Sequence, residues 1–141
     1  MIRMFEQRLG DYVLLMHSGL RWVIIILMLI LLVRGVVSLV TKDPLETADR
    51  LVSLVTVIAL DIQMLAGICL WIFRHYAYEA KDQGTPLTMY EHPTMMLAVI
   101  IGAHIANVLV KKEKRAPAMI MWMVTAVALG LAVSRVMVLK F

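Results

Sequence analysis

The chain has 141 residues, of which 62% are hydrophobic and 17% are charged, and its formal net charge is +4. Soluble domains hold roughly 45–50% apolar residues, so this composition, with a mean hydropathy of +0.85, indicates an integral membrane protein. The length suits one domain, residues 1–141, and excludes a membrane part joined to a separate soluble enzyme. Most Lys and Arg residues flank apolar segments, where lipid headgroups rather than nucleic acid are the expected partner.

Four apolar segments approach the roughly 20 helical residues that cross the hydrocarbon of a bilayer. They are residues 12–40, 51–73, 93–110 and 118–139. The connections between them are short and polar, which favours antiparallel neighbours. The sequence therefore predicts an all-α, up-down-up-down four-helix bundle in a lipid bilayer, with both termini on one side.

The first segment contains His17 and Arg21, which share a helical face because they are four residues apart. Arg34 lies about 20 Å further along the helix. If the two arginines reach the two headgroup regions by snorkelling, His17 lies at headgroup level near the side of the termini.

The second and third segments carry ionisable residues near their middles, at Asp61 and His104. Such residues are costly in a span and usually face a bundle interior or a cavity. Because the two segments are consecutive, Asp61 and His104 are expected to lie on adjacent helices and to pair. The pair is either a structural neutralisation or part of an ion or proton path through an oligomer.

His92 opens the third segment after Glu91, at a membrane level similar to that of His17. The first and third helices of such a bundle lie on a diagonal, farther apart than the roughly 8–10 Å between neighbours. That gap admits a haem b whose iron is held by two imidazoles, here His17 and His92, with Arg21 or Arg135 near the propionates. The alternative is that both histidines are ordinary interfacial residues.

The connection before the fourth segment, KKEKRAP, holds four basic residues: Lys111, Lys112, Lys114 and Arg115. Lys and Arg are enriched in cytoplasmic loops, so this side is expected to be cytoplasmic and the termini periplasmic. No nucleotide-binding or hydrolase motif occurs, which argues against a nucleotide-dependent enzyme.

Three stretches, MHSGLRW (16–22), DIQMLAGICLW (61–71) and YEHPTMM (90–96), resemble a family of small four-span bacterial membrane proteins labelled cytochrome b-like. The resemblance covers the first three helices, whereas the fourth matches only as an apolar segment. It implies a bacterial inner membrane location and roles for His17 with Arg21, for Gln63, and for Glu91 with His92. Family members often have His where this chain has Asp61, which argues against a second haem.

Together these features predict a haem b-binding electron-transfer subunit between a quinone pool and a redox partner subunit. Gln63 and Glu91 would orient ligands or handle quinone protons. Two alternatives stay open. One is a cofactor-free subunit or scaffold of a larger complex, and the other is an ion- or proton-conducting homo-oligomer that uses Asp61 and His104.

Overall fold

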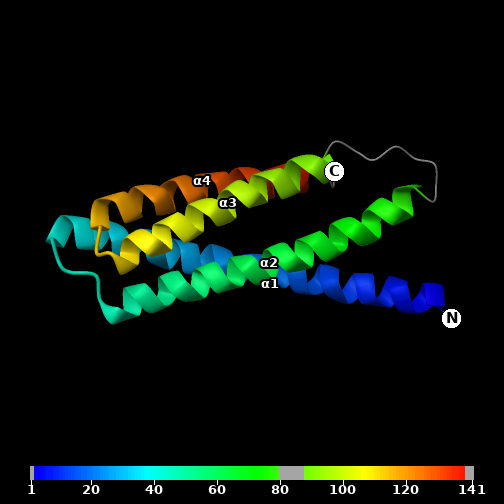
Figure 1. Cartoon of the computed structure of the whole chain (residues 1–141), viewed down its shortest axis with the longest axis horizontal. Coiled ribbons are helices and arrows are strands. Elements are labelled where there is room, and N and C mark those ends of the chain that lie inside the picture. Colours follow the sequence, from blue (N-terminus) through cyan, green and yellow to red (C-terminus); the bar gives the residue numbers. More distant parts are fainter. Residues whose placement is uncertain (1, 80–87, 139–141) are drawn as a thin grey trace.

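The computed structural model describes the backbone of residues 2–79 and 88–138 and the side chains of residues 8–73 and 90–134. Within these ranges the regular structure consists of four helices: α1 (Ile2–Thr41), α2 (Thr47–Glu79), α3 (Thr88–Lys111) and α4 (Arg115–Val138). They alternate in direction along the chain, so α1 begins and α4 ends at the same end of the molecule (Figure 1). The predicted all-α up-down-up-down bundle is confirmed.

Each helix contains a stretch that is long and apolar enough to cross a membrane. These stretches are Arg8–Thr41, Thr47–Phe73, Tyr90–Lys111 and Arg115–Ser134. The helices continue past the apolar segments because a helix satisfies its own backbone hydrogen bonds in lipid and in water alike. Thus α1 begins ten residues before the first apolar segment, and α3 begins five residues before Pro93. Pro93 lies near the start of α3, where its missing N–H removes one helical hydrogen bond.

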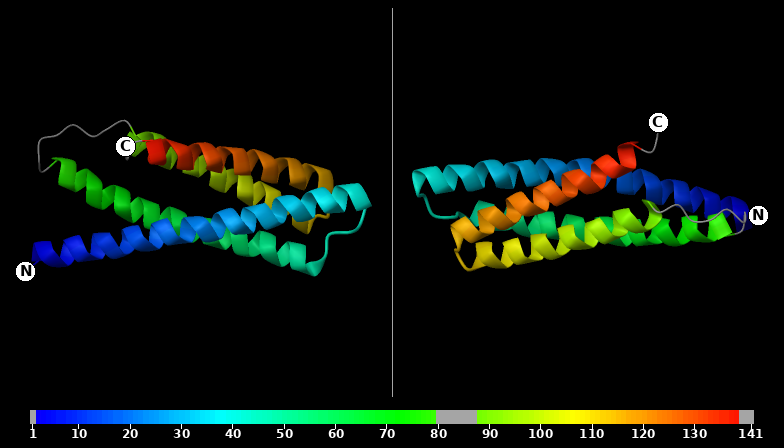
Figure 2. Two further views of the ribbon diagram at one scale, coloured as in Figure 1. Left: turned by 180° about the vertical axis from the view of Figure 1, so that it is seen from behind. Right: turned by 90° about the horizontal axis from the view of Figure 1, so that it is seen from above.

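The helices form a closed ring in which each packs against its neighbours in sequence and α4 packs against α1. The pairs α1/α2 and α3/α4 form two layers that separate toward the end where α1 begins, called here the terminal end (Figure 1). The opposite end, with residues 42–46 and 112–114, is called the hairpin end. Figure 2 shows α4 crossing α1 obliquely. In this ring α1 and α3 lie on a diagonal.

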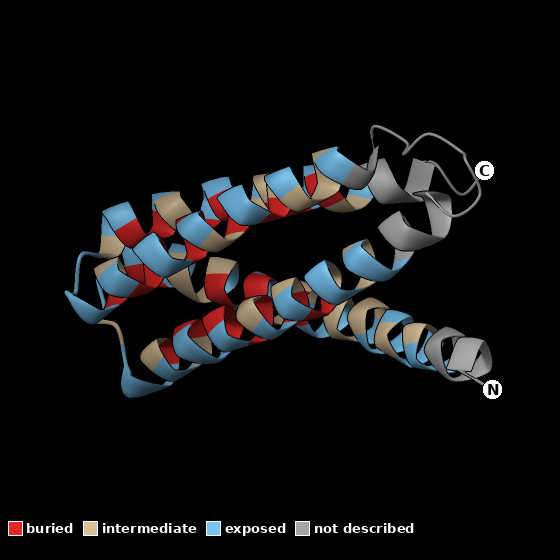
Figure 3. Cartoon of the chain, turned by 45° about the vertical axis from the view of Figure 1, so that its right-hand side comes forward, coloured by how far each residue is buried: buried red, intermediate tan, exposed pale blue. Residues whose placement is uncertain are grey.

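The buried residues lie on the helix faces that point into the ring (Figure 3). Small residues are concentrated on α3 and α4, which lets these helices approach closely; they are Gly102, Ala103, Ala106, Ala118 and Ala132. A Cβ added at Gly102 would lie 2.6 Å from the Thr125 hydroxyl. The α3–α4 seam is therefore closed by backbone and small side chains.

Both hairpins turn through a non-glycine residue in the left-handed conformation, Lys42 (φ 60°) and Glu113 (φ 58°). At the end of α3 the Lys114 N–H donates to the Leu109 carbonyl, and the Glu113 N–H donates to the Val110 carbonyl. This is the hydrogen-bond pattern of a Schellman motif. It ends α3 and starts α4 within three residues, which keeps the two helices antiparallel.

Candidate functional site

The two histidines near the terminal end of the spans come together across the diagonal of the bundle. His17 on α1 and His92 on α3 have ring centroids 6.4 Å apart, with an interplanar angle of 77°. Both side chains are partly buried. Residues separated by 75 positions thus share one polar centre between the two layers.

The carbonyl of Ala132 on α4 holds the His92 ring at 3.1 Å from Nδ1. A carbonyl oxygen only accepts hydrogen bonds, so Nδ1 carries the proton in this contact and Nε2 keeps its lone pair. Histidines that ligate metals commonly donate their other ring N–H to a backbone carbonyl in this way. His92 is therefore oriented as a ligand with Nε2 available.

Helix α2 positions His17 through two residues one turn apart. The Gln63 amide nitrogen donates to the His17 carbonyl oxygen at 2.9 Å. A Cβ added at Gly67 would lie 3.2 Å from His17 Cε1 and 3.7 Å from Nδ1. The absence of a side chain at Gly67 therefore lets the imidazole lie against α2.

Three buried polar atoms around this pair have no hydrogen-bond partner among the described residues: His17 Nδ1, Arg21 Nε and Gln63 Oε1. The Arg21 guanidinium carbon lies 5.4 Å from the centroid of the neighbouring Trp22 ring. A buried polar atom without a partner costs about 1–3 kcal/mol. Such a cluster is therefore suited to a polar ligand or to bound water that completes the missing hydrogen bonds.

The histidine pair has the dimensions of a two-imidazole metal site. Imidazole nitrogens bind metals at about 2.0 Å, so two rings on opposite sides of one metal have centroids about 6 Å apart. The 6.4 Å separation agrees with that value. No three His, Cys, Asp or Glu side chains in the described part of the chain could jointly hold a metal ion. Further ligands of a metal held by this pair would therefore have to come from outside the described side chains.

Glu91, the residue before His92 on α3, borders an open surface hollow of about 510 Å³ whose lining includes neither His17 nor His92. The hollow is bordered by Tyr90, Glu91, Thr94, Met95 and Leu131, from α3 and α4. Its volume falls within the roughly 300–1,000 Å³ of small-molecule sites. The Arg135 side chain, expected near the propionates, lies outside the described residues.

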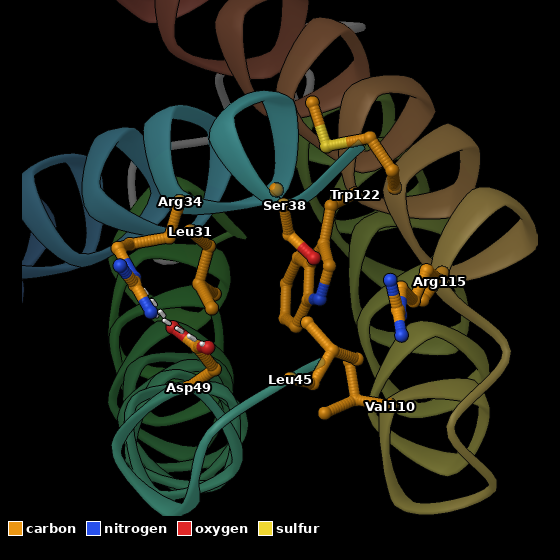
Figure 4. A pocket seen from close by; sticks show the side chains of 11 residues that line it. Leu31, Arg34, Ser38, Leu45, Asp49, Val110, Arg115 and Trp122 are labelled. Carbon is orange, nitrogen blue, oxygen red and sulfur yellow. Dashed lines mark hydrogen bonds and ion pairs between the residues drawn. The ribbon is translucent and has the colours of Figure 1, made fainter. Parts of the chain in front are cut away.

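A second polar region lies at the hairpin end (Figure 4). There Arg34 donates two hydrogen bonds to the Asp49 carboxylate, at 2.8 and 3.1 Å. The adjoining cavity of about 30 Å³ has room for water but not for an organic cofactor. The buried Trp122 indole N–H, which has no partner among the described residues, borders this cavity. This region therefore joins α1 to α2 by hydrogen bonds, and residues of α3 and α4 line the small cavity beside them.

Asp61 and His104 form the contact expected from their depths, with Asp61 Oδ1 3.1 Å from His104 Nε2. Their side chains are 45% and 52% exposed, respectively. The pair therefore lies on the outer surface of the α2–α3 seam, away from the interior of the bundle.

Gly67 and Ala132 belong to the site, but the sequence assigned no role to either. Gly67 follows Gln63 by four residues, so both lie on one helical face, and that spacing was an available signal. Ala132 acts through its carbonyl, which no sequence pattern identifies.

No protein-family model, curated protein or solved structure matches this chain.

Proposed function

We propose that the protein is a haem b-binding electron-transfer subunit of a bacterial inner membrane, with His17 and His92 as axial ligands. The observation that carries the proposal is the approach of these two rings across the bundle diagonal, with centroids 6.4 Å apart. The likeness of the HSGLRW, QMLAG and EHPTMM elements to cytochrome b-like proteins is in accord with it.

Three features of the surrounding residues bear on holding the iron and the propionates. The Ala132 carbonyl fixes the His92 tautomer, and Gly67 leaves space for the His17 ring. Arg21 has an unpaired buried Nε, which suits a propionate carboxylate, and Arg135 is a second candidate for that role. When bound, haem b supplies a one-electron carrier whose potential depends on its axial ligands and on the burial of the site.

The hollow that Glu91 borders is assigned to a quinone as the electron-exchange partner. A quinol loses two protons for each two electrons, and a carboxylate in hydrogen-bond reach can accept a proton. Glu91 borders the hollow and is assigned this role. Tyr90 and Thr94 border the same hollow and supply polar groups beside the apolar Met95 and Leu131.

The orientation follows from the basic residues of the hairpin end. Lys111, Lys112, Lys114 and Arg115 are consecutive apart from Glu113, and such clusters favour the cytoplasmic side. The histidine pair would then lie near the periplasmic side, with the termini. Electrons would accordingly be exchanged with a redox partner subunit at that surface.

The test is a reduced-minus-oxidised visible spectrum of the detergent-purified protein, with a pyridine haemochrome assay that counts haem per chain. We expect a b-type spectrum with about one haem per chain. His17→Ala and His92→Ala should each abolish it. The matched control is His104→Gln, because His104 lies twelve residues beyond His92 on α3, about 18 Å away.

The rival function is a cofactor-free subunit of a larger complex. A colourless protein after expression with ample haem supply would favour the rival, as would copurification with partner subunits in that state. If the haem spectrum survives both His17→Ala and His92→Ala, the protein binds haem but these two histidines are not its ligands.

A further inference from the structure

The Asp61–His104 pair lies where neither residue type is stable in contact with lipid. Asp61 follows Asp49, at the hairpin end, by twelve residues, about 18 Å of helix. His104 precedes Lys111, at the same end, by seven residues, about 10 Å of helix. With a hydrocarbon thickness of about 30 Å, both residues fall in the lipid interior. Their side chains are nevertheless 45% and 52% exposed in the isolated chain.

Ionisable side chains at this depth almost always face protein or a water-filled cavity. The hydrogen bond between Asp61 and His104 satisfies only one oxygen and one ring nitrogen of the pair. Among the described residues no hydrogen bond is made by the second carboxylate oxygen or by His104 Nδ1, so both can meet another partner. Lipid alone therefore leaves the pair unsatisfied, and this part of the α2–α3 surface requires protein or water against it.

The apolar surface around the pair has the spacing of a helix-packing interface. On α2 the exposed residues Leu54, Ile58, Asp61, Leu65, Ile68 and Ile72 follow one another at intervals of four and three. On α3 the same spacing connects the exposed residues Leu97, Ile101, His104 and Val108. The exposed residues Ile120, Val124, Val127 and Leu131 of α4 have the same spacing. What distinguishes the two stripes on α2 and α3 is the ionisable residue in each, and a single polar position can fix register and oligomeric state. We call these two stripes the α2–α3 face.

We propose that the α2–α3 face is the interface of a homodimer, and that each Asp61–His104 pair meets the pair of the partner subunit. All copies insert in the membrane in the same direction, so the twofold axis runs along the membrane normal. Such an axis keeps equivalent residues at equal depth. It places α2 against the partner's α3, and Asp61 opposite His104 of the partner subunit.

The chemistry of the pair selects a second copy over an unrelated helix. With both ring nitrogens of His104 carrying hydrogen, the ion pair presents one carboxylate acceptor and one N–H donor, so it is complementary to itself under twofold symmetry. A partner of one charge sign would leave either the carboxylate or the imidazole unmatched. In that protonated form the four groups close into a cycle in which each carboxylate accepts from two imidazolium rings and the four charges sum to zero. The inference is independent of haem, because the histidine pair lies elsewhere on α3.

The experiment measures subunit association in lipid bilayers by single-molecule photobleaching of singly labelled protein over a range of protein-to-lipid ratios. Wild type should dimerise. Asp61→Leu combined with His104→Leu should raise the dissociation constant about 10- to 1,000-fold, since each interhelical hydrogen bond contributes about 0.6–2 kcal/mol. Val127→Leu on the exposed face of α4 is the matched control and should dimerise as wild type does.

Two further variants keep the test decisive if the double Leu variant folds poorly, which circular dichroism would reveal. Exchanging the residues, Asp61→His with His104→Asp, preserves complementarity and should restore dimerisation. Leu65→Trp with Ile101→Trp leaves the polar pair intact but adds bulk to the face, and should weaken the dimer. A monomeric wild type at all ratios would overturn the proposal, as would a dimer that none of the α2–α3 changes affects.

Discussion

Substituting Gly102 by Ala tests the α3–α4 seam, which holds the Ala132 carbonyl against His92. The added Cβ would lie 2.6 Å from Thr125 Oγ1 and 3.6 Å from Thr125 Cβ. The hydroxyl cannot move away freely, because it donates to the Met121 carbonyl at 2.7 Å. Thr125 is also fully buried, with 1% exposure. The two helices must therefore separate, or Thr125 must lose its hydrogen bond.

The expected cost can be bounded from the geometry. Overpacking a tight core costs about 1–3 kcal/mol, whereas replacing Gly by Ala inside a helix gains up to about 1 kcal/mol. Gly130→Ala on α4 is the matched control, since its added Cβ meets nothing within 4 Å. The control carries the same propensity gain. The free energy of unfolding of Gly102→Ala should therefore be about 1–3 kcal/mol below that of Gly130→Ala.

The assay is equilibrium unfolding in mixed micelles of increasing SDS fraction, followed by helical circular dichroism. Adding Thr125→Ala removes the hydroxyl that the new Cβ meets. The double variant should therefore be nearly as stable as Thr125→Ala alone. Equal stability of Gly102→Ala and Gly130→Ala would refute the close approach of α3 and α4, and so would a double variant that shows no recovery.

Two predictions concern the candidate site itself. Gly67→Ala puts a Cβ 3.2 Å from His17 Cε1, so the ring must shift by a few tenths of an ångström. Haem content should therefore fall relative to the control Gly19→Ala, whose added Cβ meets nothing within 4 Å. Equal haem content in the two variants would contradict the packing role of Gly67. Glu91→Gln removes the proposed proton acceptor and should slow haem reduction by a quinol analogue about 100-fold or more while leaving the haem spectrum intact. Stopped-flow absorbance measures this rate, and an unchanged rate would remove Glu91 from the quinol reaction.

Hydropathy predicted the four helices and their alternation because crossing a bilayer demands long apolar segments. It did not predict where the helices end. Polar residues such as Arg3 and Glu6 continue α1 back to Ile2, since leaving the lipid does not break helical hydrogen bonds. Likewise Pro93 suggested a helix start but is accommodated inside α3. Hydropathy thus reports the depth of a segment in lipid rather than the length of its helix.

The partners of the ionisable residues were predictable from depth and helix order. His17 with His92, and Asp61 with His104, share levels on helices whose positions follow from the topology, and each pair makes a contact. Whether each pair faces the interior of the bundle or its outer surface was not predictable. In a membrane bundle lipid-facing and interior positions are both apolar, so the sequence carries little amphipathic signal to tell them apart.

Because the sequence does not show which way a residue in a span faces, substitutions at His92 and His104, both on α3, test the two directions separately. They are twelve residues apart, which corresponds to about 18 Å of rise and about 120° of rotation at 3.6 residues per turn. His92 faces the bundle diagonal, whereas His104 reaches the outer surface. A change at one position therefore leaves the environment of the other intact. Loss of haem on changing His92, together with loss of dimer on changing His104, would establish two separate sites.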